Sequence, residues 1–268
     1  MKLVSLFSGA GGLDHGFETI WANEYDRVTA GVWERNFENG AKIMNCLPID
    51  KVREFPKADG VVGGPPCQSF SIGGAKRGVD DPRSKLFYSY VNAIKVILPK
   101  FFLAENVSGL FSPRNRDTYD DILRRFRELG YLCDGQVLDA VDYGVPQNRK
   151  RLFILGYRSD LGISPTFSTP LEYKLNLLHA LTDVPYLPVL SGRGKDSYSS
   201  QYMTCNRVRK WLEPSYTIVA TRRSNPKHPD VTMIKDVGIE QWVFGASGSK
   251  RLSAIECARI QTFSDTFN

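Results

Sequence analysis

The chain has 268 residues, of which 42% are hydrophobic and 24% are charged. This composition is ordinary for a globular protein and excludes a disordered or low-complexity chain, and the length allows one large core with a smaller second lobe. A formal net charge of +6 favours a polyanionic partner such as nucleic acid, although a solvated basic surface would give the same number.

The five cysteines lie far apart, are odd in number and form no CxxC pair. They indicate neither a metal site nor a disulfide framework, so we expect a reducing compartment. The first 20 residues lack a signal-peptide pattern, and no apolar run approaches the ~18 residues that a membrane span needs. We therefore expect a soluble, cytoplasmic protein without a membrane partner.

The chain begins with the pattern of a buried strand over residues 3–7, and a glycine turn follows at 8–12. A helix is expected over 13–20. Strand, glycine turn and helix in this order are typical of a nucleotide-binding fold, but the spacing is not GxGxxG and no phosphate-binding lysine follows. The turn therefore favours a carboxylate or a ribose-bearing ligand over a pyrophosphate, with a turn needed only for packing as the alternative.

Acidic residues follow the next strands. A second short strand ends at Glu24, a position where a carboxylate usually holds a ribose diol. Asp50 supplies another carboxylate before the buried strand 60–63, which leads to Cys67. Strands that alternate with helices predict a parallel sheet, and ligands bind beyond the carboxyl ends of such strands. We therefore expect the glycine turn, Glu24, Asp50 and Cys67 to lie together.

Cys67 follows a Pro-Pro pair, which can neither continue a sheet ladder nor open a helix, so the thiol is predicted on a rigid turn. The segment 71–86 after it contains three glycines with Lys76 and Arg77, and is expected to be a loop that can move and meet phosphate. A free cysteine is more often a small buried apolar residue than a nucleophile, so the thiol alone does not decide its role.

Strands and helices continue to alternate up to Arg158. One strand ends on Glu105, and two later strands flank a basic turn with Arg149 and Arg151, which is either solvated or placed to bind an anion. The expected ranges are helices over 27–37, 83–98 and 116–129, and strands over 20–23, 101–104, 131–138 and 151–157.

After Arg158 prolines interrupt the chain and periodicity disappears, which predicts a smaller, loop-rich lobe. Between residues 187 and 227 there are eight basic residues and two acidic ones, interleaved with aromatic side chains. This pattern favours a nucleic-acid surface, with solvated loops as the alternative. The three histidines are scattered and receive no predicted role.

Six motifs, in order, resemble those of the cytosine-C5 DNA methyltransferases, which are S-adenosylmethionine-dependent enzymes typical of bacterial restriction-modification systems. The resemblance covers nearly the whole chain. It implies a Rossmann-like, mostly parallel α/β fold with a loop-rich target-recognition lobe. The motifs are FSGAGG at 7–12, NEYD at 23–26, GPPCQSFS at 64–71, ENV at 105–107, QNRKR at 147–151, and RL with ECAR within 251–259.

The resemblance implies a DNA (cytosine-5-)-methyltransferase that acts on a specific duplex sequence. Cys67 is expected to add to C6 of an extruded cytosine, which makes C5 nucleophilic toward the methyl group on the sulfonium. Glu105 is expected to share a proton with N3, Arg151 to grip the O2 side of the base, and Arg149 to support the flipped nucleotide or its phosphate. β-Elimination then removes the C5 proton and releases Cys67.

The resemblance also implies the residues that bind cofactor and DNA. The segment 71–86 would be the lid over the extruded base, and Thr217-Ile218 resembles the Thr-aliphatic dipeptide beside the recognition loops. At least one of Arg222 and Arg223 is expected to read a guanine edge. The cofactor contacts are Phe7, Gly9, Ala10, Gly11, Gly12, Glu24, Tyr25, Asp50, Gly64, Pro66 and Leu86. The DNA contacts are Gln68, Ser71, Lys76, Arg77, Thr217, Arg222 and Arg223.

By the same resemblance we expect a catalytic and cofactor-binding domain over 1–164, a target-recognition lobe over 165–247, and a return to the catalytic domain over 248–268. The family's final motif does not occur before Asn268. We therefore expect either a truncated chain or a second polypeptide that supplies the missing element. Double-stranded DNA as partner implies association with the nucleoid.

Three other functions fit the sequence less well. A tRNA methyltransferase of the same superfamily would keep the catalytic residues, but its Cys-Phe-Thr segment does not occur in the lobe, so DNA is favoured. A dehydrogenase would explain the glycine turn and would leave Cys67 and Glu105 unexplained. A non-catalytic DNA-binding subunit would be expected to lose the thiol.

Overall fold

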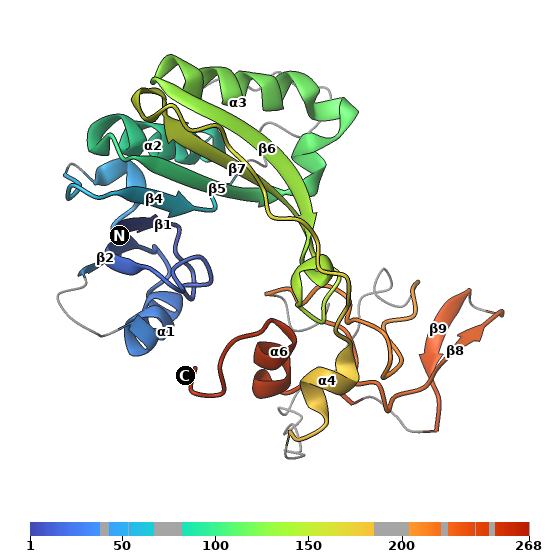
Figure 1. Cartoon of the computed structure of the whole chain (residues 1–268). Helices are drawn as coiled ribbons and strands as arrows, with labels where there is room; N and C mark the ends of the chain where they lie inside the picture. The colour runs from blue at the N-terminus through green and yellow to red at the C-terminus, as the bar shows by residue number, and fades with distance from the viewer. Residues whose placement is uncertain are drawn as a thin grey trace. The chain divides into compact units, whose positions relative to one another are not determined.

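The computed structural model describes residues 1–37, 43–52, 54–66, 82–184, 204–220, 225–238, 240–246 and 250–267, without the side chains of 43 and 82–85. The described chain forms two compact units (Figure 1). Unit 1 contains residues 1–138 and 150–168, and unit 2 contains residues 139–149 and 169–267. Each unit has its own cluster of buried apolar side chains.

Unit 1 is built on a seven-stranded sheet with the order β3-β2-β1-β4-β5-β7-β6. The first five strands in this order run parallel, and β7 runs antiparallel to β5. Helices α2 and α3 lie on one side of the sheet and α1 on the other (Figure 1). A parallel sheet must bury both faces, and helical crossovers cover them. The predicted Rossmann-like, mostly parallel α/β fold is confirmed.

Most predicted elements of unit 1 are present near their predicted ranges. The strands are β1 (Lys2–Leu6), β2 (Glu18–Asn23), β3 (Ile43–Asn45), β4 (Gly60–Gly63), β5 (Phe101–Val107), β6 (Tyr131–Asp139) and β7 (Lys150–Arg158). The helices are α1 (Arg27–Phe37), α2 (Pro82–Ile97) and α3 (Arg116–Glu128). No helix in the described part of the chain is long and apolar enough to cross a membrane.

The core of unit 1 packs around Phe102 of β5, which is fully buried. Its ring centroid lies 4.2 Å from that of Phe126 and 5.3 Å from that of Tyr131. Phe126 is one of four buried residues that recur at helical spacing along α3, which explains why this charged segment folds as a helix against the sheet. A Cβ at Gly156 would lie 2.2 Å from the Phe102 ring, so β7 pairs beside β5 because this position lacks a side chain.

The predicted helix over 13–20 is wrong. The connection between β1 and β2 consists of turns, with Gly16 at a φ of +83°. Buried Asp14 holds it by accepting hydrogen bonds from Ser5 Oγ at 3.0 Å and Thr19 Oγ1 at 2.8 Å. Burial raises the pKa of Asp14 although these hydrogen bonds oppose the shift. Because Asp14 is tied to both strands and β2 already begins at Glu18, residues 13–17 form turns instead of a helix.

Unit 2 is rich in loops, as predicted for the segment after Arg158. Helices α4 and α6 pack side by side around apolar residues that include Ile218 and Ile260 (Figure 1). Each helix begins with a capping box, at Asn176 and Ser253, which satisfies backbone N–H groups of the first turn. The described elements are α4 (Leu177–Leu181), β8 (Met233–Asp236), β9 (Gln241–Phe244) and α6 (Ala254–Ile260).

The functional domains expected over 1–164, 165–247 and 248–268 stay predictions, because the compact units are defined by packing alone. The unit boundary between residues 168 and 169 lies close to the first predicted boundary. By packing, the turn 139–149 and helix α6 both belong to unit 2.

Replacing Gly156 with alanine should destabilise the protein, because the new methyl group would overlap the ring of Phe102. We expect the free energy of unfolding to fall by about 1–3 kcal/mol, the usual cost of overpacking a core. Gly109→Ala is the matched control, since a Cβ there meets no atom within 4 Å. Urea titration measures the difference, and equal unfolding midpoints for the two variants would show that Gly156 does not govern the packing of β7 on β5.

Candidate functional site

The predicted site residues of unit 1 follow the carboxyl ends of adjacent strands. Phe7 follows β1, Glu24 follows β2, Gly64 follows β4, and Glu105 lies near the end of β5. The order of the strands reverses between β1 and β4, because β2 and β3 extend the sheet on one side and β4 and β5 on the other. Such a switch point leaves a crevice beyond the strand ends, where open α/β sheets bind ligands.

The glycine turn after β1 is tied to Glu24. Gly9 N donates a hydrogen bond to Glu24 Oε2 at 3.0 Å, and Asp26 N donates to Glu24 Oε1 at 2.9 Å. A Cβ at Gly11 would lie 2.1 Å from the ring of Phe37, so packing alone requires this glycine. Both glycines have a positive φ, +56° at Gly9 and +92° at Gly11, but a Cβ at Gly9 would meet no atom within 4 Å. The turn is therefore open to a ligand at Gly9.

Glu105 and Arg151 form an ion pair in unit 1. Arg151 Nε lies 2.8 Å from Glu105 Oε1, and the two side chains are 22% and 25% exposed, respectively. Because β5 and β7 are antiparallel with Val107 opposite Arg151, the guanidinium reaches diagonally to Glu105 on the same face. The other carboxylate oxygen, Oε2, lies beside the turn after β4, since a Cβ at Gly64 would be 3.3 Å from it.

The turn that leads to Cys67 is held by the end of the same strand. Asn106 Nδ2 donates a hydrogen bond to Pro65 O at 2.9 Å. Cys67 lies outside the described residues, and Pro66 immediately before it is partly buried. Asn106 received no role from the sequence alone, although its position directly after Glu105 at a strand end was the available signal. Its side-chain amide thus links the proline turn to β5, the strand that carries Glu105.

Two other thiols are poor nucleophiles. Burial raises the pKa of Cys133 to about 11 and the pKa of Cys257 to about 11. Because the thiolate is the reactive form of cysteine, neither side chain is activated at neutral pH. Cys205 is an exposed free thiol and Cys46 a partly exposed one, and both provide comparison positions for any test of Cys67.

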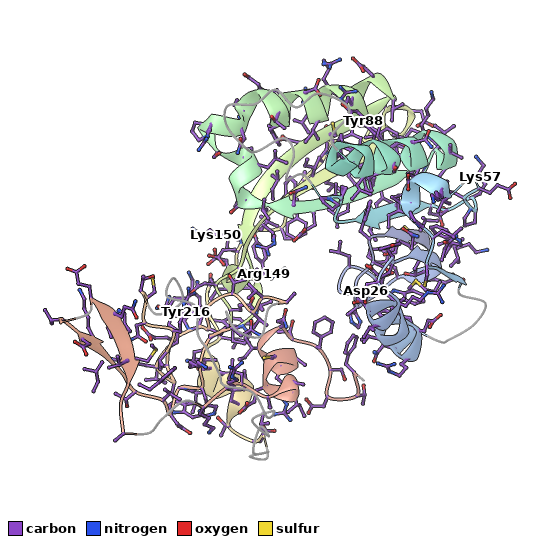
Figure 2. All side chains as sticks on the ribbon, turned by 180° about the vertical axis from the view of Figure 1, so that it is seen from behind. Asp26, Lys57, Tyr88, Arg149, Lys150 and Tyr216 are labelled. Atoms are coloured by element: carbon purple, nitrogen blue, oxygen red, sulfur yellow. The ribbon has the colours of Figure 1, made fainter. Side chains whose placement is uncertain are left out.

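The remaining candidates for cofactor contacts lie in different surroundings. Tyr25 is 71% exposed. Asp50 lies in a short 3-10 helix. It lines a pocket of about 300 Å³ together with Asn92 and Tyr88 of α2, the latter labelled in Figure 2. Leu86 packs against the core of unit 1 and does not line that pocket. Asp50 thus faces a depression of its own, whose lining does not include the glycine turn or Glu24. Ala10 is partly buried, and Gly12 is exposed.

Arg149 lies in unit 2, where its segment pairs with the segment around Thr217. Thr217 Oγ1 donates a hydrogen bond to Asn148 O at 2.7 Å, and Ile218 N donates to Gln147 Oε1 at 3.1 Å. Arg149 Nη1 donates to Ile218 O at 3.3 Å. Two motifs that are distant in sequence therefore form one structure, in which Gln147 is fully buried. This pairing was missed because no local pattern in the sequence encodes it.

The predicted DNA contacts can be placed only in part. Thr217 is described, with its hydroxyl on Asn148 O. The lid expected over 71–86 is described only from residue 82, where α2 begins. Six further DNA contacts lie outside the described residues, namely Gln68, Ser71, Lys76, Arg77, Arg222 and Arg223.

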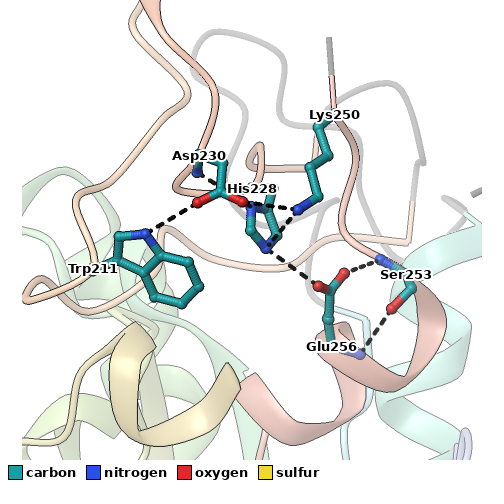
Figure 3. Close-up of polar contacts among 6 residues, drawn as sticks. All are labelled: Trp211, His228, Asp230, Lys250, Ser253 and Glu256. Carbon is teal, nitrogen blue, oxygen red and sulfur yellow. Dashed lines mark hydrogen bonds and ion pairs between the residues drawn. The ribbon is translucent and has the colours of Figure 1, made fainter. Parts of the chain in front are cut away.

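A polar cluster in unit 2 surrounds a buried histidine for which the sequence predicts no role (Figure 3). His228, with a side chain 5% exposed, lies between Asp230 (Nδ1 to Oδ2, 3.2 Å) and Glu256 (Nε2 to Oε1, 3.4 Å). Lys250 Nζ lies 3.0 Å from Asp230 Oδ2, and Trp211 Nε1 donates to Asp230 Oδ1 at 3.2 Å. We name these five residues the His228 cluster. A single histidine leaves no spacing pattern, so only its burial and its partners reveal this role.

The carboxyls of the His228 cluster are held ionised. Burial would raise the pKa of Asp230, but the hydrogen bond from Lys250 and the nearby positive charges outweigh it and lower the pKa. Burial likewise opposes ionisation of Glu256, and hydrogen bonds from His228 and from the backbone of Ser253 lower its pKa. The cluster therefore joins the loop at 228–230 to helix α6 by charged hydrogen bonds.

Comparison with known proteins identifies relatives along the whole chain. The model of the C-5 cytosine-specific DNA methylase family matches residues 1–268. The Type II methyltransferase M.FnuDI of Fusobacterium nucleatum is 43% identical over all of this chain and 85% of its own length. The Type II methyltransferase M.MthTI of Methanothermobacter thermautotrophicus is 41% identical over all of this chain and 88% of its own length.

Solved structures share the fold of this chain. A prophage-encoded DNA modification methyltransferase of E. coli aligns with a TM-score of 0.59 and 26% identity over 70% of this chain and 56% of that protein. The Entamoeba histolytica methyltransferase EhMeth aligns with a TM-score of 0.66 over all of this chain and 88% of that protein, at 16% identity, and so shows the fold. None of these comparisons supports the expected second polypeptide. The chain belongs to the C-5 cytosine-specific DNA methylase family.

Proposed function

We propose that this chain methylates C5 of cytosine in duplex DNA with Cys67 as nucleophile, Glu105 as proton carrier and S-adenosylmethionine as methyl donor. The observation that carries the residue assignment is the ion pair of Glu105 with Arg151 beside the turn that leads to Cys67. Membership of the family supports the reaction class, because the family methylates this carbon of cytosine in DNA.

The thiol performs the first step. Cytosine C5 is a poor nucleophile until a thiolate adds to C6 and moves electron density to C5 and N3. Cys67 Sγ therefore bonds to C6, and C5 then accepts the methyl group. The C5 proton then passes to solvent and its electron pair re-forms the C5–C6 double bond. The Sγ–C6 bond breaks to release the thiolate, and the proton shared at N3 returns to Glu105.

The proton at N3 is assigned to one oxygen of Glu105. Arg151 Nε engages Oε1, so Oε2 beside Gly64 is the oxygen available to hold or share a proton with N3. Arg151 is itself oriented, because its Nη1 donates a hydrogen bond to Lys150 O at 2.9 Å. In this proposal its remaining N–H groups grip O2 of the base, and Arg149 supports the extruded nucleotide or its phosphate.

S-adenosylmethionine, when bound, supplies an electrophilic methyl group on a sulfonium. The open backbone at Gly9 and the carboxylate of Glu24 fit such a ligand. Each oxygen of Glu24 accepts one backbone hydrogen bond and retains a lone pair with which it can hold a ribose hydroxyl. The proposed contacts are Phe7, Gly9, Ala10, Gly11, Gly12, Glu24, Tyr25, Asp50, Gly64, Pro66 and Leu86.

Duplex DNA is the proposed partner, which associates the protein with the nucleoid. A paired base cannot reach a thiol in a protein crevice, so the target cytosine is extruded at a cost of about a few kcal/mol. Basic residues of the lobe meet phosphates, and base edges carry the sequence information. The proposed DNA contacts are Gln68, Ser71, Lys76, Arg77, Thr217, Arg222 and Arg223.

Methyl transfer from labelled S-adenosylmethionine to duplex DNA, compared with transfer to tRNA, tests this function. We expect label at C5 of cytosine in duplex DNA. Label in tRNA alone would identify an RNA methyltransferase with the same catalytic residues. If neither substrate acquires label, the proposed methyltransferase function is wrong.

Cys67→Ser should reduce methyl transfer to below about one per cent, because losing a covalent nucleophile raises the barrier by several kcal/mol. Cofactor binding should stay near the wild-type value, since the hydroxyl is similar in size to the thiol. Cys205→Ser is the control, because Cys205 is an exposed thiol in unit 2. Calorimetry with cofactor and single-turnover methylation measure the two effects. Turnover of the Cys67 variant at the level of the control would contradict the role.

Glu105→Gln and Arg151→Gln should each lower kcat by about 10²-fold or more, and the double variant should lose far less than the product of the two effects. The reason is that Arg151 acts partly through its contact with Glu105, so we expect a coupling of about 1–3 kcal/mol. Arg158→Gln is the control on the same strand, because Arg158 pairs with Asp160. Strictly additive losses in log kcat would show that the ion pair has no part in catalysis.

A further inference from the structure

Unit 2 contains a pocket of about 400 Å³ that no step above uses. Its wall includes two basic residues, Arg209 and Lys210, with Tyr216 beside them. Val231 and Met233 give it an apolar side, and Glu213 is the one acidic residue among its described lining residues. Six of its ten described lining residues are polar or charged, so this concave site suits a polar or charged ligand more than an apolar one.

Arg209 is oriented by stacking. Its guanidinium carbon lies 4.0 Å from the centroid of the Tyr216 ring (Figure 2 labels Tyr216). The Arg209 side chain is 29% exposed, and its Nε is buried without a hydrogen-bond partner among the described residues. Its Nη1 lies 3.7 Å from Glu213 Oε1, a loose ion pair beyond hydrogen-bond distance. Stacking on Tyr216 thus orients the Arg209 guanidinium, and Glu213 does not supply an acceptor for all of its N–H groups.

The wall behind this cation is rigid. Glu213 Oε2 accepts a hydrogen bond from Lys210 N at 2.8 Å, which fixes the turn that carries both basic residues. Trp211 in the same turn donates to Asp230 of the His228 cluster (Figure 3). Pro229 and Val231, on either side of Asp230, line the pocket. The pocket is therefore preorganised by one charged hydrogen bond within its lining, at Glu213, and by another outside it, at Asp230.

We propose that this pocket binds a phosphodiester of the DNA substrate, with Arg209 and Lys210 on the phosphate and Tyr216 against the adjoining sugar. This inference rests on the proposed function, since it assumes DNA as partner. Two cations against one carboxylate favour an anion, and a planar guanidinium suits phosphate oxygens. Glu213 competes with the phosphate for Arg209, so its charge limits the affinity for DNA.

Equilibrium binding of a duplex at several salt concentrations tests the site with three variants. Arg209→Ala should weaken binding about tenfold on all sequences and reduce the slope of log K against log salt by about 1. Glu213→Gln should strengthen binding about two- to fivefold, because the amide keeps the acceptor for Lys210 N and removes the competing charge. Lys235→Ala, an exposed lysine of β8 in the same unit, is the matched control and should show less than half of the Arg209 effect.

Methylation kinetics separate this inference from the proposed function. The Arg209 variant should raise KM for DNA and leave kcat near the wild-type value, and its unfolding midpoint is checked against Lys235→Ala. Equal binding by the Arg209 and Lys235 variants, or no gain from Glu213→Gln, would overturn the phosphate site while wild-type methylation of DNA still stands. A loss confined to one DNA sequence would overturn it too, in favour of contact with a base edge. Absence of methylation by the wild-type protein would instead refute the proposed function.

Discussion

The contact between Glu105 and Arg151 is the constraint on which the candidate site depends. It exists because β7 lies antiparallel beside β5, which brings two side chains from distant parts of the sequence onto one face of the sheet. That pairing requires space over Phe102, and Gly156 provides it by lacking a Cβ. A partly exposed ion pair contributes only about 0–1 kcal/mol to stability. In the proposed mechanism its importance lies in orienting one carboxylate oxygen and leaving the other for proton transfer.

The neighbouring contacts extend this constraint. Asn106 fixes the proline turn before Cys67, and Glu24 fixes the glycine turn at the next strand ends along the sheet. Unit 2 contains a comparable contact, because buried His228 links its loop to buried Glu256 of α6. The chain passes from unit 2 to unit 1 between Arg149 and Arg151. One short motif therefore supplies a guanidinium to each unit.

Elements with a clear apolar period could be predicted from the sequence. The buried stripe of α3 and the continuous run of β4 are examples, and their observed bounds are close to the expected ones. The expected helix at 13–20 failed because burial of Asp14 between two strands is a tertiary effect. Glu105 and Arg151 were identified as site residues by resemblance, but their contact depends on strand register, which has no local signal. The role of His228 depends on three segments that meet only in the fold.

In the proposed mechanism Cys67 attacks C6 of cytosine while Glu105 and Arg151 contact N3 and O2 of the same base. Incubation of the protein and S-adenosylmethionine with duplex DNA that carries 5-fluorocytosine at the target position tests it most directly. Fluorine at C5 prevents the final elimination, so the Sγ–C6 bond should persist. We predict a covalent protein–DNA complex whose linked peptide contains Cys67 by mass spectrometry. No complex, or linkage through Cys46 or Cys205, would contradict the account.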